Sequence, residues 1–434
     1  MSSFLVSPCN SLSGVIAIPG DKSISHRAIM LGSIANGVTK VSGFLEGNDS
    51  LATLKSFQQM GVDIERLGSN VTINGVGMHG LRAPGKPIDL GNSGTSMRLM
   101  AGLLSAQSFD SELCGDESLS KRPMDRIIEP LRQMGAKIEG HNSKPPLTIS
   151  GNQPLRPITY ELPVASAQIK SCLLLSGLYA EGETCIVENV TTRDHTERML
   201  RGFGYQVNCS DNCITLDGGG ELKACDIDIP SDISSAAFFM VAASIARDAD
   251  LTLKAVNINP TRTGIIEILQ LMGANITLSN ESEMAGEMIA DIQIRSADLK
   301  GIRIPNELVP LAIDEFPVLF IAASCADGET LLTGAKELRV KESDRIQVMA
   351  DGLAVLGIKT EVLDDGIRIQ GGQFTKPNTS IKSHHDHRIS MSFAVASVAC
   401  NFDIKIEDVD NVKTSFPNFV ELGNRIGINI NELH

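Results

Sequence analysis

The sequence has no tryptophan and only 3 tyrosines among its 434 residues. Proteins that bind single-stranded nucleic acid stack bases on such rings, so this class is poorly supported. Positive charge is also in deficit, because 38 Lys and Arg face 52 Asp and Glu, which leaves a net charge of −14. A balance of this sign argues against nucleic acid or an anionic membrane surface as the partner. These absences favour a protein that binds a small molecule.

Long apolar runs and metal-type cysteine pairs are missing too. The nearly apolar segments 236–246 and 316–323 fall well short of the roughly 20 residues that a membrane-spanning helix needs. The 9 cysteines are scattered and none is spaced as Cys-x-x-Cys, which argues against zinc. We expect reduced core thiols in a cytoplasmic protein. The first basic residue is Lys22, so the positive region of a signal peptide is not expected.

A repeat dominates what the sequence does contain. A hydrophobic residue, a glycine and a short alternating run recur six times, with the glycines 74, 69, 69, 84 and 70 residues apart. Each glycine ends an amphipathic stretch, which is where a helix places a left-handed residue. The glycines are Gly61, Gly135, Gly204, Gly273, Gly357 and Gly427.

A helix-start signal lies upstream of each glycine and introduces an apolar stretch. The repeating unit is therefore predicted as strand, helix, strand, helix, strand, strand. Six α/β units are too many for one core, so we expect two domains of three units. The helix-start residues are Asp21, Ser93, Ser166, Asp232, Asp314 and Asp386.

Basic residues gather at these helix starts and at those of the second helices, although a helix N-terminus favours negative charge. Free backbone N–H groups and arginine side chains both bind phosphate or carboxylate. Any one of these arginines could be a surface residue paired with a carboxylate, but that reading is hard to sustain for equivalent positions in several repeats. The pattern indicates a polyanionic small ligand.

Two carboxylates stand out in the fifth repeat. Asp314 and Glu342 lie at the starts of its two helices, among apolar or basic neighbours. As a pair they could supply acid and base catalysis, and singly each could be an ordinary helix-start carboxylate. The histidines of the segment 384–387 have no carboxylate or cysteine spacing that completes a metal site.

Seven short motifs occur in order between about residue 14 and residue 420, and they are GDKSISHR (20–27), GNSGT (91–95), KRPM (121–124), SAQ (166–168), RDHTE (193–197), KESDR (341–345) and DHR (386–388). Together they resemble the 5-enolpyruvylshikimate-3-phosphate synthases, or 3-phosphoshikimate 1-carboxyvinyltransferases. The motifs at 166–168 and 193–197 resemble the subgroup called class II.

The resemblance implies an α/β, two-domain enolpyruvyl transferase fold, in which each domain holds three βαβαββ units around a pseudo-threefold axis. The chain would cross between the domains near Asp21 and near Asp232. One domain would span residues 21–231 and the other residues 1–20 with 232–434, with the active site in the cleft between them. The repeat agrees with this fold but does not by itself show which units share a domain.

The resemblance also implies a reaction. The enolpyruvyl group of phosphoenolpyruvate would move to the 5-hydroxyl of shikimate 3-phosphate, and phosphate would leave by addition and elimination through a tetrahedral intermediate. Both substrates are polyanions, which suits the cations at the helix starts. No metal and no cofactor is implied, and a monomer in the cytoplasm is expected.

By resemblance, the catalytic residues are Asp314, Glu342 and Lys22. Asp314 would take the proton of the 5-hydroxyl, Glu342 would protonate the methylene carbon and Lys341 would help to neutralise charge in the intermediate. The residues expected to bind shikimate 3-phosphate are Lys22, Ser23, Arg27, Ser166, Ala167, Gln168, Arg193, Asp314 and Lys341. Those expected to bind phosphoenolpyruvate are Lys22, Asn92, Gly94, Thr95, Arg122, Gln168, Arg345, Arg388 and Lys413.

Two positions depart from the pattern of the family. Thr414 stands where the family often has lysine, and Lys413 lies one residue earlier, so its contact with phosphoenolpyruvate is open. Gly94 stands where class II members that tolerate the inhibitor glyphosate often carry alanine, so sensitivity to this inhibitor is open too.

Three other readings are disfavoured. A transferase acting on UDP-N-acetylglucosamine would have Lys-Asn-Ala-Ala at residues 22–25 and a cysteine where Glu117 stands. A non-catalytic repeat protein that binds an anion would not need Asp314 together with Glu342. An RNA-end-processing enzyme of related architecture does not suit the acidic composition and the few aromatic residues.

Overall fold

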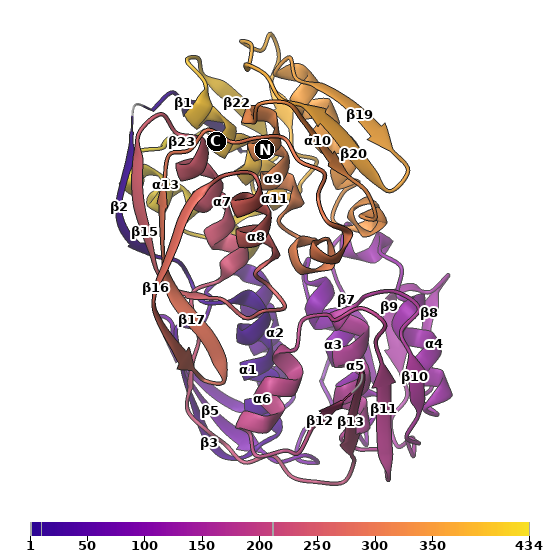
Figure 1. Ribbon diagram of the computed structural model, residues 1–434. Coiled ribbons are helices and arrows are strands. Elements are labelled where there is room, and N and C mark those ends of the chain that lie inside the picture. The colour runs from indigo at the N-terminus through magenta and orange to yellow at the C-terminus, as the bar shows by residue number, and fades with distance from the viewer. Residues whose placement is uncertain (1, 10, 211, 434) are drawn as a thin grey trace. The chain divides into compact units, whose positions relative to one another are not determined.

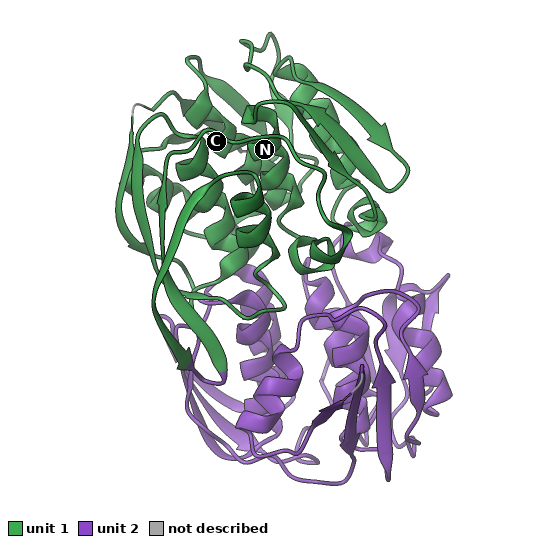
Figure 2. Cartoon of the chain, viewed as in Figure 1, with its two compact units in different colours: residues 1–19, 230–283, 287–434 green, residues 20–229, 284–286 purple. Residues whose placement is uncertain are grey.

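The computed structural model describes residues 2–9, 11–210 and 212–433, which form two compact units (Figures 1 and 2). Unit 1 comprises Met1–Pro19, Pro230–Glu283 and Glu287–His434, and unit 2 comprises Gly20–Ile229 with Met284–Gly286. Each unit has its own hydrophobic core. The chain therefore begins in unit 1, builds unit 2 and returns to complete unit 1.

Unit 2 contains three four-stranded sheets of the same design, with strand orders β14-β3-β5-β4, β6-β7-β9-β8 and β10-β11-β13-β12. In each sheet the first two strands are parallel and the remaining pairs are antiparallel. The strands are β3 (Asn36–Ser42), β4 (Asp63–Leu67), β5 (Asn70–Val76), β6 (Ile88–Asp89), β7 (Ser111–Cys114), β8 (Ile138–His141), β9 (Lys144–Ile149), β10 (Thr159–Glu161), β11 (Glu183–Val187), β12 (Asn208–Ser210), β13 (Cys213–Asp217) and β14 (Ile227–Asp228).

Unit 1 repeats this design with strand orders β16-β17-β15-β2, β18-β20-β19 and β21-β22-β1-β23. In the three-stranded sheet, isolated parallel bridges from Lys300 and Arg303 stand where the fourth strand would be. The strands are β1 (Ser3–Ser7), β2 (Leu12–Ala17), β15 (Ala249–Asn257), β16 (Asn275–Met284), β17 (Glu287–Arg295), β18 (Glu329–Leu332), β19 (Lys359–Leu363), β20 (Gly366–Gln370), β21 (Ile381–Lys382), β22 (Ile404–Glu407) and β23 (Asn429–Leu433).

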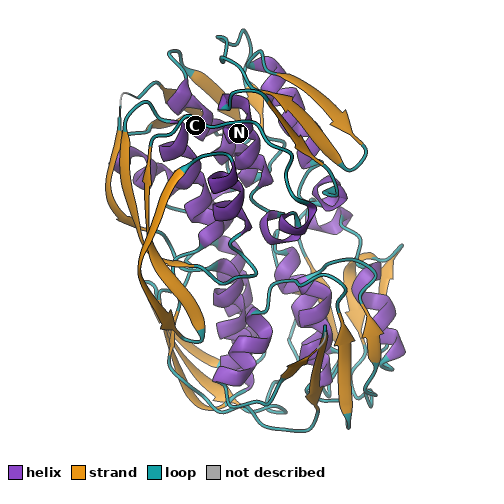
Figure 3. Ribbon diagram, viewed as in Figure 1, coloured by secondary structure: helices purple, strands orange, loops and turns teal. Residues whose placement is uncertain are grey.

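The first helix of every repeat is buried on nearly all sides, and within each unit these helices pack on one another beside the sheets (Figure 3). This explains the two apolar runs of the sequence, which form the buried helices of unit 1. Among the described residues, no helix is both long and apolar enough to cross a membrane. The first helices are α1 (Lys22–Ile34), α3 (Gly94–Leu104), α5 (Ala167–Gly177), α7 (Ile233–Ile245), α9 (Phe316–Cys325) and α11 (His387–Ala396).

The second helices confirm the predicted glycine turns. All six glycines, from Gly61 to Gly427, have φ between 76° and 112°, the left-handed region that suits glycine. The helices are α2 (Asn48–Gln59), α4 (Asp125–Gln133), α6 (His195–Gly202), α8 (Gly264–Leu271), α10 (Arg345–Val355) and α13 (Phe419–Ile426).

Five of the six predicted helix-start residues cap their helices through the side chain, and they are Asp21, Ser93, Ser166, Asp232 and Asp386. The prediction is wrong at Asp314. Helix α9 has Glu315 at its N-cap position, and no side chain caps it. Proline at the start of the helix removes one of the N–H groups that a cap would satisfy, and the Asp314 carboxylate is used elsewhere.

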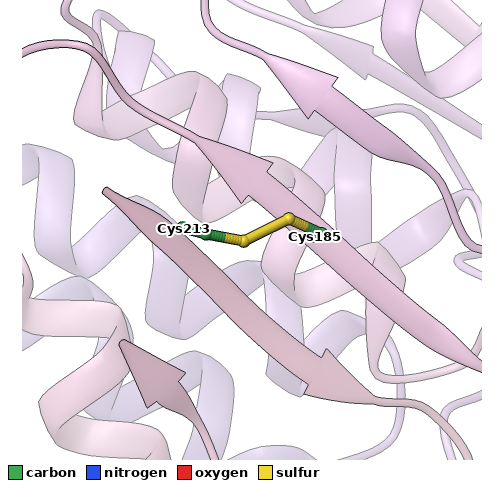
Figure 4. Close-up of a disulfide and its surroundings, with 2 residues drawn as sticks. All are labelled: Cys185 and Cys213. Carbon is green, nitrogen blue, oxygen red and sulfur yellow. A yellow bond between two sulfur atoms is a disulfide. The ribbon is translucent and has the colours of Figure 1, made fainter. Parts of the chain in front are cut away.

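The expectation of reduced thiols is wrong for one pair of cysteines. Cys185 on β11 and Cys213 on β13 form a disulfide (Figure 4). The two strands pair antiparallel, and these residues are diagonal neighbours with Cα atoms 6.3 Å apart, within the range that a disulfide can bridge. The other cysteines are free thiols.

Gly218 provides a test of how tightly the repeats are packed. A Cβ at Gly218, just after β13, would lie 1.9 Å from the Ala180 carbonyl oxygen. We expect Gly218→Ala to lower the free energy of unfolding by about 1–3 kcal/mol, because the backbone must move. A matched control is Gly202→Ala, at the end of α6, where a Cβ meets nothing within 4 Å. Urea unfolding of the two variants compares them, and equal midpoints would contradict this packing.

Candidate active site

In unit 2, the start of α1 holds its basic residues in place. The Asp21 carboxylate accepts a hydrogen bond from the Ile24 amide at 2.9 Å, which caps the helix. Lys22, the first residue of α1, forms an ion pair with Asp49 at the start of α2. The Lys22 side chain is partly exposed, whereas that of Asp49 is buried. Lys22 and Ser23 therefore lie in the first turn of a helix, and the Lys22 ammonium group is held there by Asp49.

Arg27 lies one turn further along α1 and is buried. Its Nε donates to Thr196 Oγ1 at 2.7 Å and its Nη2 donates to Ser171 Oγ at 2.7 Å. Its Nη1 donates to the Ser23 carbonyl oxygen at 2.9 Å. Because these partners come from α1, α5 and α6, Arg27 connects the first repeat to the third.

A second group surrounds the start of α3. Arg122 Nη2 donates to Asn92 Oδ1 at 2.6 Å, and Asn92 Nδ2 donates to Asp116 Oδ2 at 2.7 Å. Gly94 faces two guanidinium groups, because a Cβ there would lie 3.0 Å from Arg122 Nη1 and 3.0 Å from Arg98 Nη1. The missing side chain at Gly94 thus leaves room for both arginines.

Gln168, near the start of α5, is oriented by its neighbours on α3. Its Oε1 accepts from Arg98 Nη1 at 2.8 Å and its Nε2 donates to Thr95 Oγ1 at 3.1 Å. Ser166 caps α5, since its Oγ accepts from the Ile169 amide at 3.4 Å. Ala167 is the first residue of that helix, and Arg193 is partly exposed, two residues before α6.

In unit 1, the buried Arg345 is the centre of a charged cluster. Its Nε donates to Asp386 Oδ2 at 2.9 Å, its Nη2 to Glu342 Oε2 at 2.6 Å and its Nη1 to Asp314 Oδ1 at 3.4 Å. Burial alone would lower the pKa of Arg345, but the three carboxylates outweigh burial and raise it. Arg345 therefore stays charged and joins three helix starts.

Asp314 has a second cation beside it. Lys341 Nζ lies 3.1 Å from Asp314 Oδ1, and Arg388 Nη1 donates to the Asp314 main-chain oxygen at 2.8 Å. Both Asp314 and Glu342 are partly exposed, with side chains 17% and 20% accessible. Each carboxylate therefore pairs with the buried Arg345 and is still accessible to a bound substrate.

Lys413 lies apart from these contacts. It is in the short helix α12 (Val412–Ser415), is about half exposed and forms an ion pair with Glu432 Oε1 at 2.8 Å. The carboxylate that Lys413 pairs with is thus not one of the three that hold Arg345. Among the residues that the structure describes, no group of three His, Cys, Asp or Glu is arranged to hold a metal ion.

Sequence reasoning passed over several residues that shape the site. Asp386 was predicted only as a helix cap, yet it also holds Arg345. Thr196 lies in the 193–197 motif and Arg98 lies in the helix start that follows Ser93, but neither was assigned a site role, and Asp49 was not considered. Each of the three nevertheless binds a predicted site residue. The signal that could have found them is their place in the first turns of helices, next to basic residues.

The chain itself matches a known protein family. The model of that family, EPSP synthase (3-phosphoshikimate 1-carboxyvinyltransferase), matches residues 6–422. The chain belongs to the EPSP synthase family. The expected family, fold class and enzyme class are confirmed, so the chain is a transferase of the shikimate pathway, which supplies aromatic amino acids.

Individual relatives agree with this assignment. The chain is similar to a 3-phosphoshikimate 1-carboxyvinyltransferase of Ruthia magnifica subsp. Calyptogena magnifica, at 71% identity over 431 residues and 99% of each chain. Its structure is similar to the solved EPSP synthase of Acinetobacter baumannii, with a TM-score of 0.89 and 57% identity over 100% of both chains. The enolpyruvyl transferase NikO of Streptomyces tendae shares the fold, with a TM-score of 0.81 at 16% identity over 100% of this chain and 99% of that chain.

His26, between the site residues of α1, is fully buried. Its Nδ1 lies 2.8 Å from Thr53 Oγ1 and 3.2 Å from Ser96 Oγ, so it joins α1, α2 and α3. Burial lowers the pKa of His26 well below its ordinary value, and the nearby Lys22 and Arg27 lower it further. The folded protein thus keeps this imidazole neutral where the unfolded chain would protonate it.

The pH dependence of stability tests this account of His26. Below about pH 6.5 the unfolded chain binds a proton that the folded chain excludes, so the free energy of unfolding falls by up to about 1.4 kcal/mol per pH unit. The loss continues until the pH reaches the lowered folded pKa. We expect His26→Gln to flatten this slope in urea unfolding between pH 7.5 and 5.5, whereas His141→Gln, at an exposed site, leaves it unchanged. Parallel slopes for the wild type and His26→Gln would contradict the account.

Proposed function

We propose that the basic helix starts of both units hold shikimate 3-phosphate and phosphoenolpyruvate together while the enolpyruvyl group is transferred. Shikimate 3-phosphate would contact Lys22, Ser23, Arg27, Ser166, Ala167, Gln168, Arg193, Asp314 and Lys341. Phosphoenolpyruvate would contact Lys22, Asn92, Gly94, Thr95, Arg122, Gln168, Arg345 and Arg388. Lys413 would join them only if it leaves Glu432. Two anions repel each other, so a preformed set of cations stabilises them side by side.

The observation that carries the proposal is the position of Asp314. Its carboxylate departs from the capping role of the other five helix-start residues and instead lies 3.1 Å from Lys341 Nζ and 3.4 Å from Arg345 Nη1. The two cations hold this carboxylate in place, and its partial exposure leaves it accessible to a hydroxyl of a bound substrate, from which a carboxylate can accept a proton. Asp314 is therefore our candidate for the base.

The proposed chemistry has two steps. The 5-hydroxyl oxygen attacks C2 of phosphoenolpyruvate while Asp314 takes its proton and Glu342 gives a proton to C3, which yields a tetrahedral intermediate. Glu342 then takes a proton back from C3 as the bond between C2 and the phosphate oxygen breaks, and Asp314 gives its proton to the leaving phosphate, which restores the double bond and both side chains. Lys22 and Lys341 would balance the changing charge.

The two compact units would act as the two domains of the family, each contributing one half of the site. The contacts of Arg27 and Arg122 lie within unit 2, and those of Arg345 and Asp314 lie within unit 1. We propose that the units close around the substrates, which excludes water from the reaction. We further propose a monomer that acts in the cytoplasm. The seven free thiols agree with that compartment, whereas the Cys185–Cys213 disulfide is unusual there.

Replacement of Asp314 tests the role of the base. We expect Asp314→Asn to lower kcat for phosphate release by about 10²–10⁴-fold, because the amide cannot accept the proton. The matched control is Asp344→Asn, which alters a neighbouring carboxylate that caps α10 and pairs with Arg339. If both variants lose activity equally, or if Asp314→Asn keeps its kcat, Asp314 is not the base.

Gly94 tests the phosphoenolpyruvate subsite. A methyl group at Gly94 would crowd Arg122 and Arg98 at 3.0 Å, so these guanidinium groups must shift. We expect Gly94→Ala to raise KM for phosphoenolpyruvate by about 10-fold, since small displacements of binding groups are expensive, with a smaller effect on shikimate 3-phosphate. Steady-state kinetics with each substrate varied measures this. An unchanged KM for phosphoenolpyruvate would place this substrate elsewhere.

A further inference from the structure

Unit 2 contains a buried charged group that the proposed mechanism does not use. Lys170, on α5, is fully buried, and its Nζ lies 3.1 Å from Glu188 Oε2 and 2.8 Å from Glu197 Oε1. It also donates to the main-chain oxygen of Thr192 at 3.4 Å. Lys170 follows Gln168 by two residues, and its partners lie directly after β11, in the segment before α6 and in α6 itself (Figure 1).

Stability alone does not account for this cluster. A buried ion pair is expensive to desolvate, and apolar side chains of similar volume often replace one without loss of stability. The cluster is also unbalanced, since one cation faces two carboxylates, and Glu197 Oε2 has no hydrogen-bond partner among the described residues. Burial raises the pKa of Glu197, with Lys170 opposing this shift. Because burying the Lys170 charge is unfavourable, we expect Lys170 to hold neighbouring parts of the chain in one arrangement.

The geometry that it fixes is that of the segment between Thr192 and Glu197. Glu188 accepts hydrogen bonds from the Thr192 amide at 3.2 Å and from Thr192 Oγ1 at 2.8 Å, so one end of the segment is tied to Glu188 and Lys170. The other end is tied through the ion pair of Glu197 with Lys170. Arg193 lies between these two ties, next to Thr192.

The same segment reaches a second residue of the proposed site. Thr196 Oγ1 accepts from Arg27 Nε and donates to Ser171 Oγ, each at 2.7 Å. Ser171 is the residue after Lys170 on α5. A shift of α5 relative to the segment would therefore move Arg193 and loosen Arg27 as well.

We propose that Lys170 is a positioning residue for shikimate 3-phosphate: it holds both ends of the segment 192–197 against α5 and so sets where Arg193 meets the substrate. The inference rests on the proposed function, because Arg193 is assigned there to this substrate. Lys170 itself is buried and touches neither substrate. Its effect is expected on the affinity for shikimate 3-phosphate and not on the chemical step.

A double-mutant cycle tests whether Lys170 acts through Arg193. Lys170→Met, Arg193→Ala and the double variant are compared by calorimetric titration with shikimate 3-phosphate alone. We expect Lys170→Met to weaken binding by about 10–100-fold, as a displaced binding group does. The loss in the double variant should fall well below the product of the two single losses. Multiplicative losses would overturn the proposal.

Steady-state kinetics separates positioning from general damage. Lys170→Met should raise KM for shikimate 3-phosphate and leave kcat and KM for phosphoenolpyruvate within about 3-fold of wild type, since Arg193 and Arg27 are both assigned to shikimate 3-phosphate alone. Lys170→Arg, which keeps the charge, should recover part of the affinity. The control Arg132→Met removes a cation of α4 that also holds a main-chain oxygen, that of Ile138 at 3.1 Å, and should leave both KM values unchanged.

The remaining outcomes are also decisive. If Lys170→Met does not fold, Glu188→Gln replaces it, because this variant weakens the contacts of Glu188 with Lys170 and Thr192. Unchanged binding of shikimate 3-phosphate in that variant overturns the proposal. If the wild type releases no phosphate with shikimate 3-phosphate, the proposed function fails. If the wild type is active and Lys170→Met is merely less stable, with unchanged affinity for shikimate 3-phosphate, only the positioning role fails.

Discussion

The site of unit 1 depends on the hydrogen-bonded ion pairs between the buried Arg345 and three carboxylates. Asp314, Glu342 and Asp386 come from three different helix starts, and each lies within 3.4 Å of the guanidinium group. A buried arginine without such partners would be strongly destabilising, and loss of one partner of a buried pair costs about 3–5 kcal/mol. The same contacts that stabilise the charge therefore place Asp314 and Glu342 side by side.

In unit 2 the cations of the proposed site are held in place by hydrogen bonds and single ion pairs. Lys22 has Asp49, Arg122 has Asn92, and Arg27 has the hydroxyls of Thr196 and Ser171. Each cation is thus oriented in the absence of substrate, and less conformational entropy is lost when an anion binds. This preorganisation also explains how a chain of net charge −14 keeps several cations together: nearby carboxylates and amides offset their repulsion.

Much of the fold could be predicted from the sequence, because it depends on local rules. The six glycine turns need a left-handed residue after a helix, and five helix caps need a short polar side chain, so both produce a sequence pattern at a fixed spacing.

Asp314 has the same residue type at the same spacing but pairs with Lys341 and Arg345. Local rules cannot show this difference, because its cause lies 27 and 31 residues away in the sequence. The Cys185–Cys213 disulfide was missed for the same reason, since only strand pairing makes these residues neighbours.

In the sequence, Lys170 is one more basic residue near a helix start, and only its burial in the structure distinguishes it. The candidate substrates followed from resemblance of the motifs to a family, because cations at helix starts indicate an anion but not which one.

The acceptor specificity of the wild-type chain tests the central claim most directly. Phosphate release from phosphoenolpyruvate is measured with shikimate 3-phosphate in one series and with UDP-N-acetylglucosamine in the other. The account predicts turnover that saturates with shikimate 3-phosphate and none above background with UDP-N-acetylglucosamine. Release with UDP-N-acetylglucosamine, or with neither acceptor, would contradict it.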